Sequence, residues 1–98
     1  MKASREVVIT INNGLHARPA MQFVDLANQF QSNIRVEKLD EEPVEADGKS
    51  VMSMITLIAP RDTRLRITAE GEDAPQAVAK LAALLDEIAA DENQTPAQ

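Results

Sequence analysis

The 98-residue sequence contains no cysteine, tryptophan or tyrosine, and its only aromatic residues are Phe23 and Phe30. Without cysteine, the chain cannot form a disulfide scaffold, a thiol catalyst, or a cysteine-based zinc or iron–sulfur site. The net charge is −6, from 10 basic and 16 acidic residues. A nucleic-acid-binding domain would need a basic surface and aromatic platforms for bases, so we expect no nucleic-acid partner.

Long apolar runs are also absent from the sequence. The longest mainly apolar stretch, residues 51–59, includes Ser53 and Thr56 and is about half the ~20 residues that a membrane-spanning helix needs. The apolar residues at 7–11 are few, alternate with others, and lead into the turn sequence Asn12-Asn13-Gly14, which does not resemble a signal peptide. We therefore expect a cytoplasmic protein that does not contact a membrane.

The length and the hydrophobic content of 44% are those of one compact soluble domain. Two domains would each be too small to form a core. We expect a single domain over residues 1–91, because the apolar periodicity of the last segment stops there. Residues 92–98 are then expected to be a frayed C-terminal tail.

Four segments show the two-residue apolar period of a strand with one buried face: residues 7–11, 32–40, 44–47 and 64–69. Three others suggest helices. From Ala17 to Phe30 the apolar residues follow helical spacing over about four turns. Residues 50–57 favour a short helix that Ser50 caps, although their β-branched content equally suits a buried strand. The last helix is expected to begin after an N-cap at Asp73, with Pro75 in its first turn.

The predicted order is strand, helix, strand, strand, short helix, strand, helix. Since each strand has one apolar face, the helices should cover one side of a sheet and leave the other side in water. This is an α+β fold with two layers.

The side chain with the clearest chemical potential is His16, the only histidine. It is expected at the N-cap of the first helix, where the N–H groups of Ala17 and Arg18 have no intrahelical acceptor. The helix dipole and the Arg18 guanidinium both favour an anion there. Serine, threonine, aspartate or asparagine would cap better than histidine. A cationic surrounding favours the neutral, nucleophilic ring, and the place suits a covalently bound phosphoryl group.

Other interpretations of His16 are available from the residues alone. A single histidine in a loop before a helix is most often an ordinary surface residue. A metal site is disfavoured, because no second histidine or carboxylate lies at ligand spacing. A serine hydrolase is disfavoured because the sequence has no Gly-x-Ser-x-Gly nucleophile elbow.

The sequence around His16 reads GLHARPA over residues 14–20 and is followed by Phe23-Val24. It resembles the active-site signature of HPr, the histidine phosphocarrier family of the bacterial phosphotransferase system. The resemblance continues through GKSVM at residues 48–52, similar to the regulatory serine segment of that family, and through EGED at residues 70–73. Only the first motif is specific, but together the motifs extend over nearly the whole chain.

The resemblance implies an open-faced β-sandwich of order β-α-β-β-α-β-α, with a four-stranded antiparallel sheet covered on one side by three helices. It implies that His16 accepts a phosphoryl group from phosphorylated enzyme I and passes it to a IIA-type permease component. The chain would then be a carrier without a cofactor or a metal, not an enzyme, and most simply a monomer. The family uses the δ nitrogen of the imidazole, but the sequence does not show which nitrogen reacts here.

The resemblance also implies roles for residues away from His16. Ser50 matches the serine that an ATP-dependent serine kinase/phosphorylase modifies in many bacteria, although the same serine could simply cap its helix. Three residues match the partner-docking face, namely Val51, Met52 and Ile55, although an apolar helix can also be core. Met21 departs from the small residue that the family usually has there, and an exposed Met21 would enlarge the docking face.

A regulatory paralogue remains the alternative function. In that case the chain would belong to a nitrogen-branch or catabolite-repression system and act mainly by phosphorylation-dependent binding to partners such as a transcriptional regulator. The presence of His16 argues against a regulator that depends on the serine alone.

Overall fold

The computed structural model describes residues 1–94. Seven elements follow one another along the chain: β1 (Lys2–Val8), α1 (Ala17–Ala27), β2 (Asn33–Lys38), β3 (Val44–Asp47), α2 (Val51–Ile55), β4 (Arg64–Glu70) and α3 (Ala74–Asn93). The four strands form one antiparallel sheet with the order β1-β4-β2-β3. The predicted element order and the open-faced fold are therefore confirmed. No helix in the described part of the chain is long and apolar enough to span a membrane.

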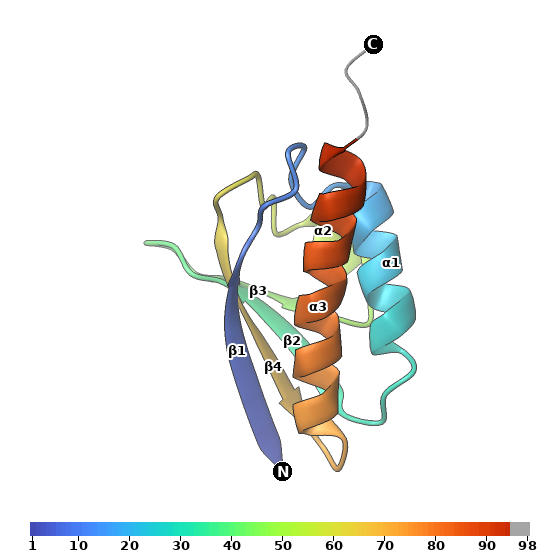
Figure 1. Ribbon diagram of the computed structural model, residues 1–98. Helices are drawn as coiled ribbons and strands as arrows, with labels where there is room; N and C mark the ends of the chain where they lie inside the picture. The colour runs from blue at the N-terminus through green and yellow to red at the C-terminus, as the bar shows by residue number, and fades with distance from the viewer. Residues whose placement is uncertain (95–98) are drawn as a thin grey trace.

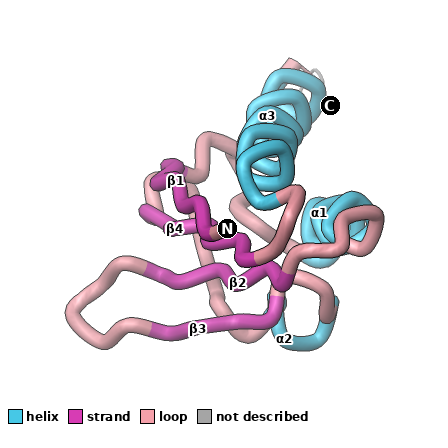
Figure 2. The backbone as a smooth tube through the Cα atoms, turned by 90° about the horizontal axis from the view of Figure 1, so that it is seen from below, coloured by secondary structure: helices cyan, strands magenta, loops and turns pink. Residues whose placement is uncertain are grey.

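The helices lie on one face of the sheet, with α1 and α3 side by side and the short α2 next to α1 and β3 (Figures 1 and 2). The other face is open and carries charged side chains such as Arg66, which pairs with Glu6 and Glu37. This arrangement follows from the alternation in the strands, since Leu65, Ile67 and Ala69 of β4 are buried while the residues between them are not.

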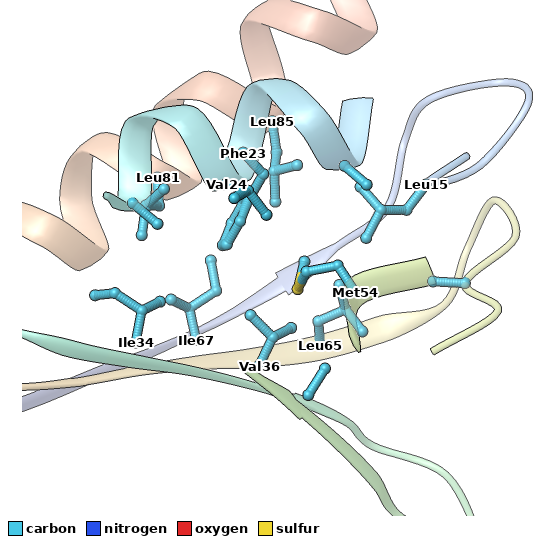
Figure 3. Packing of buried hydrophobic residues seen from close by; sticks show 14 of the residues in the cluster. Leu15, Phe23, Val24, Ile34, Val36, Met54, Leu65, Ile67, Leu81 and Leu85 are labelled. Carbon is cyan, nitrogen blue, oxygen red and sulfur yellow. The ribbon is translucent and has the colours of Figure 1, made fainter. Parts of the chain in front are cut away.

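The core lies between the sheet and the helices. Figure 3 shows Phe23 and Val24 of α1 and Leu81 and Leu85 of α3 directed toward Ile34, Val36 and Ile67 of the strands. Met54 of α2 is 1% exposed and fills the end of this core near Leu65. α2 therefore has a buried residue, Met54, and an exposed one, Ile55, on different sides.

The first strand differs from its prediction. Residues 7–11 were expected to form it, but β1 covers Lys2–Val8, most of whose residues are polar or exposed. β1 is an edge strand paired along its full length with β4, and this backbone pairing does not depend on an apolar pattern. Ile9 and Ile11 are buried as expected, but they lie in the loop that leads toward His16.

Helix boundaries differ as well. α1 ends at Ala27, so Phe30 lies beyond the helix and is only half-buried. The expected fraying from residue 92 is wrong for the first residues of that segment, because α3 continues through Asn93. The physical reason is that Glu92 and Asn93 hydrogen-bond to the segment that precedes α1. The remainder of the predicted tail, residues 95–98, lies outside the described residues.

Asp73 occupies the N-cap position of α3 as predicted, but its side chain does not cap that helix. Its carboxylate instead accepts hydrogen bonds from the backbone N–H groups of Gln31 and Ser32 and from the Ser32 hydroxyl. These bonds tie the start of α3 to the loop before β2.

Candidate functional site

His16 lies at the junction between the β1–α1 loop and α1, at the N-cap position that the sequence predicted. The loop is held in place by its neighbours, because the Leu15 N–H donates to the Ala59 carbonyl at 2.8 Å. Gly14 makes this approach possible. Its φ is +74°, and a Cβ at this position would lie 2.7 Å from the Ala59 carbonyl oxygen and 2.8 Å from Pro60 Cα. Only glycine accepts both the conformation and the contact.

The first turn of α1 leaves two backbone donors without an acceptor. The Ala20 N–H donates to the His16 carbonyl, and Pro19 has no N–H to donate. The N–H groups of Ala17 and Arg18 have no partner within residues 1–94. The His16 side chain does not cap the helix either, so these two donors remain available to an anion beside the ring.

Arg18 adds a full positive charge to the same turn. Its side chain is exposed and forms no ion pair or hydrogen bond with any described residue. A guanidinium that no carboxylate already occupies can bind the oxygens of an incoming phosphoryl group.

One ring nitrogen of His16 has a partner. Its Nε2 lies 3.2 Å from Oε1 of Glu92, near the C-terminal end of α3, with side-chain exposures of 40% and 22%. A carboxylate can only accept a hydrogen bond, so a neutral His16 ring in this pair carries its proton on Nε2. The nucleophilic lone pair is then on Nδ1.

The end of α3 is fastened to the loop before His16 by the next residue, Asn93. Its side-chain oxygen accepts from the Asn12 N–H, and its side-chain amide donates to the Thr10 carbonyl, both at 2.9 Å. Figure 1 shows the last turns of α3 beside the loop that enters α1. Arg61 also donates to the side chain of Asn12 at 2.9 Å.

The sequence prediction missed Glu92 and Asn93 because both lie in the segment, residues 92–98, that was expected to fray. A signal for Glu92 was nevertheless present. The buried residues Leu81, Leu85 and Ile88 are spaced by four and three positions, and Glu92 follows at the next interval of four. A carboxylate at the next position of a buried helical stripe indicates that a polar partner is close by.

Several predicted docking residues are exposed near this turn. Met21 of α1 is 53% exposed, and Met52 and Ile55 of α2 are 77% and 42% exposed. Val51 differs, because it is half-buried and packs against the core. Since α1 and α2 are neighbours, the exposed residues extend the surface beside His16 with apolar side chains.

Ser50 is the N-cap of α2 as predicted, and its hydroxyl oxygen accepts from the Ser53 N–H at 3.2 Å. Ser53 in turn accepts from the Asp47 N–H at 2.9 Å. The Lys49 ammonium donates to the Phe30 carbonyl at 2.7 Å, which ties this segment to the turn that follows α1. The Ser50 side chain is thus ordered and half-buried.

The histidine site is open rather than enclosed. Two hollows of about 520 and 560 Å³ lie over the open face of the sheet, and His16 lines neither of them. Within residues 1–94, no group of three or more histidine or acidic side chains is arranged to hold a metal ion. The site can thus offer a nucleophilic nitrogen, two backbone donors and one guanidinium to a group that another molecule delivers.

Comparison with known proteins agrees with this geometry. Residues 3–87 match the family model described as the PTS HPr component phosphorylation site. The chain is 44% identical over 82 residues to the phosphocarrier protein HPr of Haemophilus influenzae, covering 84% of this chain and 93% of that protein. It is 45% identical over 87 residues to the multiphosphoryl transfer protein of Salmonella typhimurium, covering 89% of this chain. The chain spans only 22% of the length of that larger protein.

The fold is also similar to solved structures. The histidine-containing phosphocarrier protein from Mycoplasma superposes with a TM-score of 0.81 at 32% sequence identity, covering 89% of this chain and 96% of that one.

Proposed function

This chain belongs to the HPr phosphocarrier family of the phosphotransferase system, and from that premise we propose that His16 accepts a phosphoryl group from phosphorylated enzyme I and passes it to a IIA-type component of a sugar permease. The protein is then a carrier, with phosphohistidine as its intermediate and no cofactor of its own. The proposal places it in the cytoplasm, where phosphoenolpyruvate is formed.

The observation that carries the proposal is the arrangement at the start of α1. His16 is exposed, its Nε2 is paired with Glu92, and the same turn holds two N–H groups and a guanidinium that have no partner among residues 1–94. The free nitrogen is Nδ1, so we assign the phosphorylated atom to Nδ1 of His16.

The transfer itself needs little from the carrier. The lone pair of Nδ1 attacks phosphorus as the bond between phosphorus and the donor nitrogen breaks, and that electron pair returns to the donor ring. Donation to the next histidine reverses the same step. Positioning and charge stabilisation account for most of such a reaction. Two backbone donors and Arg18 stabilise the phosphoryl oxygens without enclosing them, which suits a group that must leave again.

Half of the positioning must come from the partner, because the histidine lies on an open surface. The exposed apolar residues Met21, Met52 and Ile55 form the surface that would contact enzyme I and the IIA component. Methionine side chains adapt to different partners, which suits a carrier that binds two of them in turn. The protein would work most simply as a monomer, because a second copy on this surface would block it.

We further propose that Ser50 is a regulatory phosphorylation site for a serine kinase/phosphorylase. The support is its match to the family motif and its place directly before the residues that face the partner. A phosphate adds about two negative charges at pH 7. Such charge on the docking surface would weaken binding to an acidic partner.

The regulatory alternative involves the same phosphohistidine but a different recipient. A nitrogen-branch or catabolite-repression protein would accept phosphate from enzyme I and then bind a transcriptional regulator rather than donate to a sugar permease. The second step of the experiment below separates the two functions.

The test incubates the protein with enzyme I and labelled phosphoenolpyruvate, and then adds a purified IIA component. We expect one phosphate per chain that is labile in acid and stable in base, absent in His16→Ala and present in Ser50→Ala. The IIA component should then remove it. A label that survives in His16→Ala would contradict the assignment. A normal label that no IIA component removes would favour the regulatory alternative.

A further inference from the structure

We propose that Glu92 is a positioning residue for phosphoryl transfer: its carboxylate holds the proton on Nε2 of His16, directs the lone pair to Nδ1, and stabilises the positive charge that the ring gains when phosphate is attached. This inference rests on the proposed carrier function. The observation behind it is the 3.2 Å contact between Nε2 and Oε1 of Glu92.

Glu92 is held at the ring by its surroundings. The next residue, Asn93, makes two hydrogen bonds of 2.9 Å to the loop before His16, one to the Asn12 N–H and one to the Thr10 carbonyl. These bonds connect the end of α3 to the same loop that carries the histidine. The Glu92 side chain is only 22% exposed. Its surroundings already restrict its rotamers, so pairing with His16 costs less conformational entropy than it would for a fully exposed side chain.

The chemistry of the transfer explains why a carboxylate is useful on that side of the ring. When Nδ1 bonds to phosphorus and Nε2 keeps its proton, the ring carries a positive charge and the phosphoryl group carries two negative charges. A carboxylate that accepts from Nε2–H stabilises this ring, as the aspartate behind the histidine of a serine protease stabilises the imidazolium.

The same pair assists donation. When the bond between Nδ1 and phosphorus breaks, the electron pair returns to Nδ1 and the ring leaves as neutral imidazole, because Nε2 still holds its proton. A ring that had lost this proton would have to leave as an anionic imidazolate, which is a far poorer leaving group. Glu92 therefore assists acceptance by stabilising the charge that develops on the ring, and it assists donation by keeping Nε2 protonated so that the ring leaves as neutral imidazole.

Glu92 and Asn93 lie beyond residue 87, where the match to the family model ends. The contact is thus a property of the continuation of α3 in this chain, and the family match assigns no role to it. The two residues act together, since Asn93 places the helix end and Glu92 contacts the ring.

The experiment compares four variants with the unmodified protein. Glu92→Ala removes the carboxylate, and Glu92→Gln keeps a hydrogen-bond acceptor without the charge. Asn93→Ala keeps the carboxylate but releases the end of the helix. Glu87→Gln is the matched control, because it removes an exposed acidic residue of the same helix.

Three measurements separate positioning from structural damage. With enzyme I and phosphoenolpyruvate, we expect the maximal rate of phosphorylation to fall about 3- to 10-fold in Glu92→Ala, with KM unchanged. Phosphohistidine made with phosphoramidate, which needs no protein partner, should hydrolyse more slowly by a similar factor. Ring ¹⁵N spectra of the unphosphorylated protein should show a larger fraction of the Nδ1–H tautomer.

Glu92→Gln should lie between Glu92→Ala and the unmodified protein, Asn93→Ala should change in the same direction, and Glu87→Gln should match the unmodified protein. A Glu92→Ala variant with unchanged rate, phosphohistidine lifetime and ring spectrum would overturn the inference. If enzyme I fails to label the unmodified protein, the carrier function fails instead, and the phosphoramidate and spectral measurements still decide the role of Glu92.

Discussion

The carboxylate of Asp73 accepts two hydrogen bonds from Ser32, one from its backbone N–H at 2.9 Å and one from its hydroxyl at 2.5 Å, although 41 positions separate the two residues. A third bond comes from the Gln31 N–H at 2.8 Å. The hydroxyl bond, followed by the Gln31 bond, lowers the pKa of Asp73 below its ordinary value of 3.8. Ser32 is fully buried, so the contact fixes the start of α3 to the loop that leads into β2.

The lowered pKa of Asp73 predicts a pH dependence of stability. Because the folded state favours the ionised carboxylate, its contribution is fully present above the unfolded pKa of about 3.8 and is lost as the pH falls through the lower folded pKa. Asp73→Asn should therefore reduce the free energy of unfolding at pH 7, and the difference from the unmodified protein should shrink below about pH 4. Urea denaturation at pH 7 and pH 3 measures both values.

The control for this prediction is Asp25→Asn, because Asp25 is exposed on α1 and has no described hydrogen bond. It should change the free energy of unfolding little at either pH. If the difference in the free energy of unfolding between Asp73→Asn and the unmodified protein grew toward low pH, the assigned lowering of the Asp73 pKa would be contradicted.

Gly14→Ala should disrupt the loop that carries His16. The new Cβ would meet two backbone atoms at 2.7 and 2.8 Å, at a residue whose φ is +74°. We expect a loss of about 2–4 kcal/mol in the free energy of unfolding, from the strained conformation and the clash together. Denaturant unfolding measures it. A loss below about 0.5 kcal/mol, the range of ordinary surface substitutions, would mean that the loop relaxes freely.

Arg18→Ala should slow phosphoryl transfer without unfolding the protein. The side chain is exposed and forms no hydrogen bond or ion pair with described residues, so stability should change by less than about 0.5 kcal/mol. We expect the transfer rate to fall by about tenfold or more, because a cation aimed at the phosphoryl oxygens is lost. Arg18→Lys should be intermediate. Arg64→Ala, on the open face of the sheet, is the control. An equal loss of transfer rate in Arg64→Ala would mean that Arg18 acts only through the overall charge of the protein.

Substitutions of Ser50 should separate its capping role from its regulatory one. Ser50→Ala removes the acceptor for the Ser53 N–H and should cost about 0.5–2 kcal/mol of stability, with enzyme I binding retained. Ser50→Asp keeps a capping oxygen and adds charge, so it should preserve stability and weaken binding. Calorimetric titration with enzyme I measures the affinity. Equal affinity in Ser50→Asp and the unmodified protein would remove the regulatory claim.

Ile58 is a β-branched residue with φ +49° and a side chain that is 74% exposed. Its backbone is held there by the Lys38 ammonium, which donates to the Leu57 and Ile58 carbonyls. We expect Ile58→Asn to raise the free energy of unfolding by about 1 kcal/mol, because asparagine adopts this conformation at lower cost. Met52→Asn, at an exposed helical position, should give no gain. Thermal unfolding of Ile58→Asn below the unmodified midpoint would contradict the assigned strain.

The regular elements were predictable where burial repeats along the chain. β2, β4 and the apolar faces of α1 and α3 follow from their periodicities, and the Ser50 cap follows from residue type. β1 was misplaced because backbone pairing with β4 along its full length, and not an apolar pattern, defines this strand. The Asp73 side chain was expected to cap α3, but it accepts hydrogen bonds from Gln31 and Ser32 instead. No local sequence pattern connects Asp73 to these two residues.

The sequence alone predicts a histidine at the start of a helix, an arginine two positions later and the signature that surrounds them. It can do so because helix capping and residue spacing are local properties of the chain. Folding alone decided that the far end of α3 returns to that histidine. The hydrogen bonds of Asn93 and the position of Glu92 depend on how a twenty-residue helix crosses the sheet, and only three-dimensional packing sets where such a helix ends.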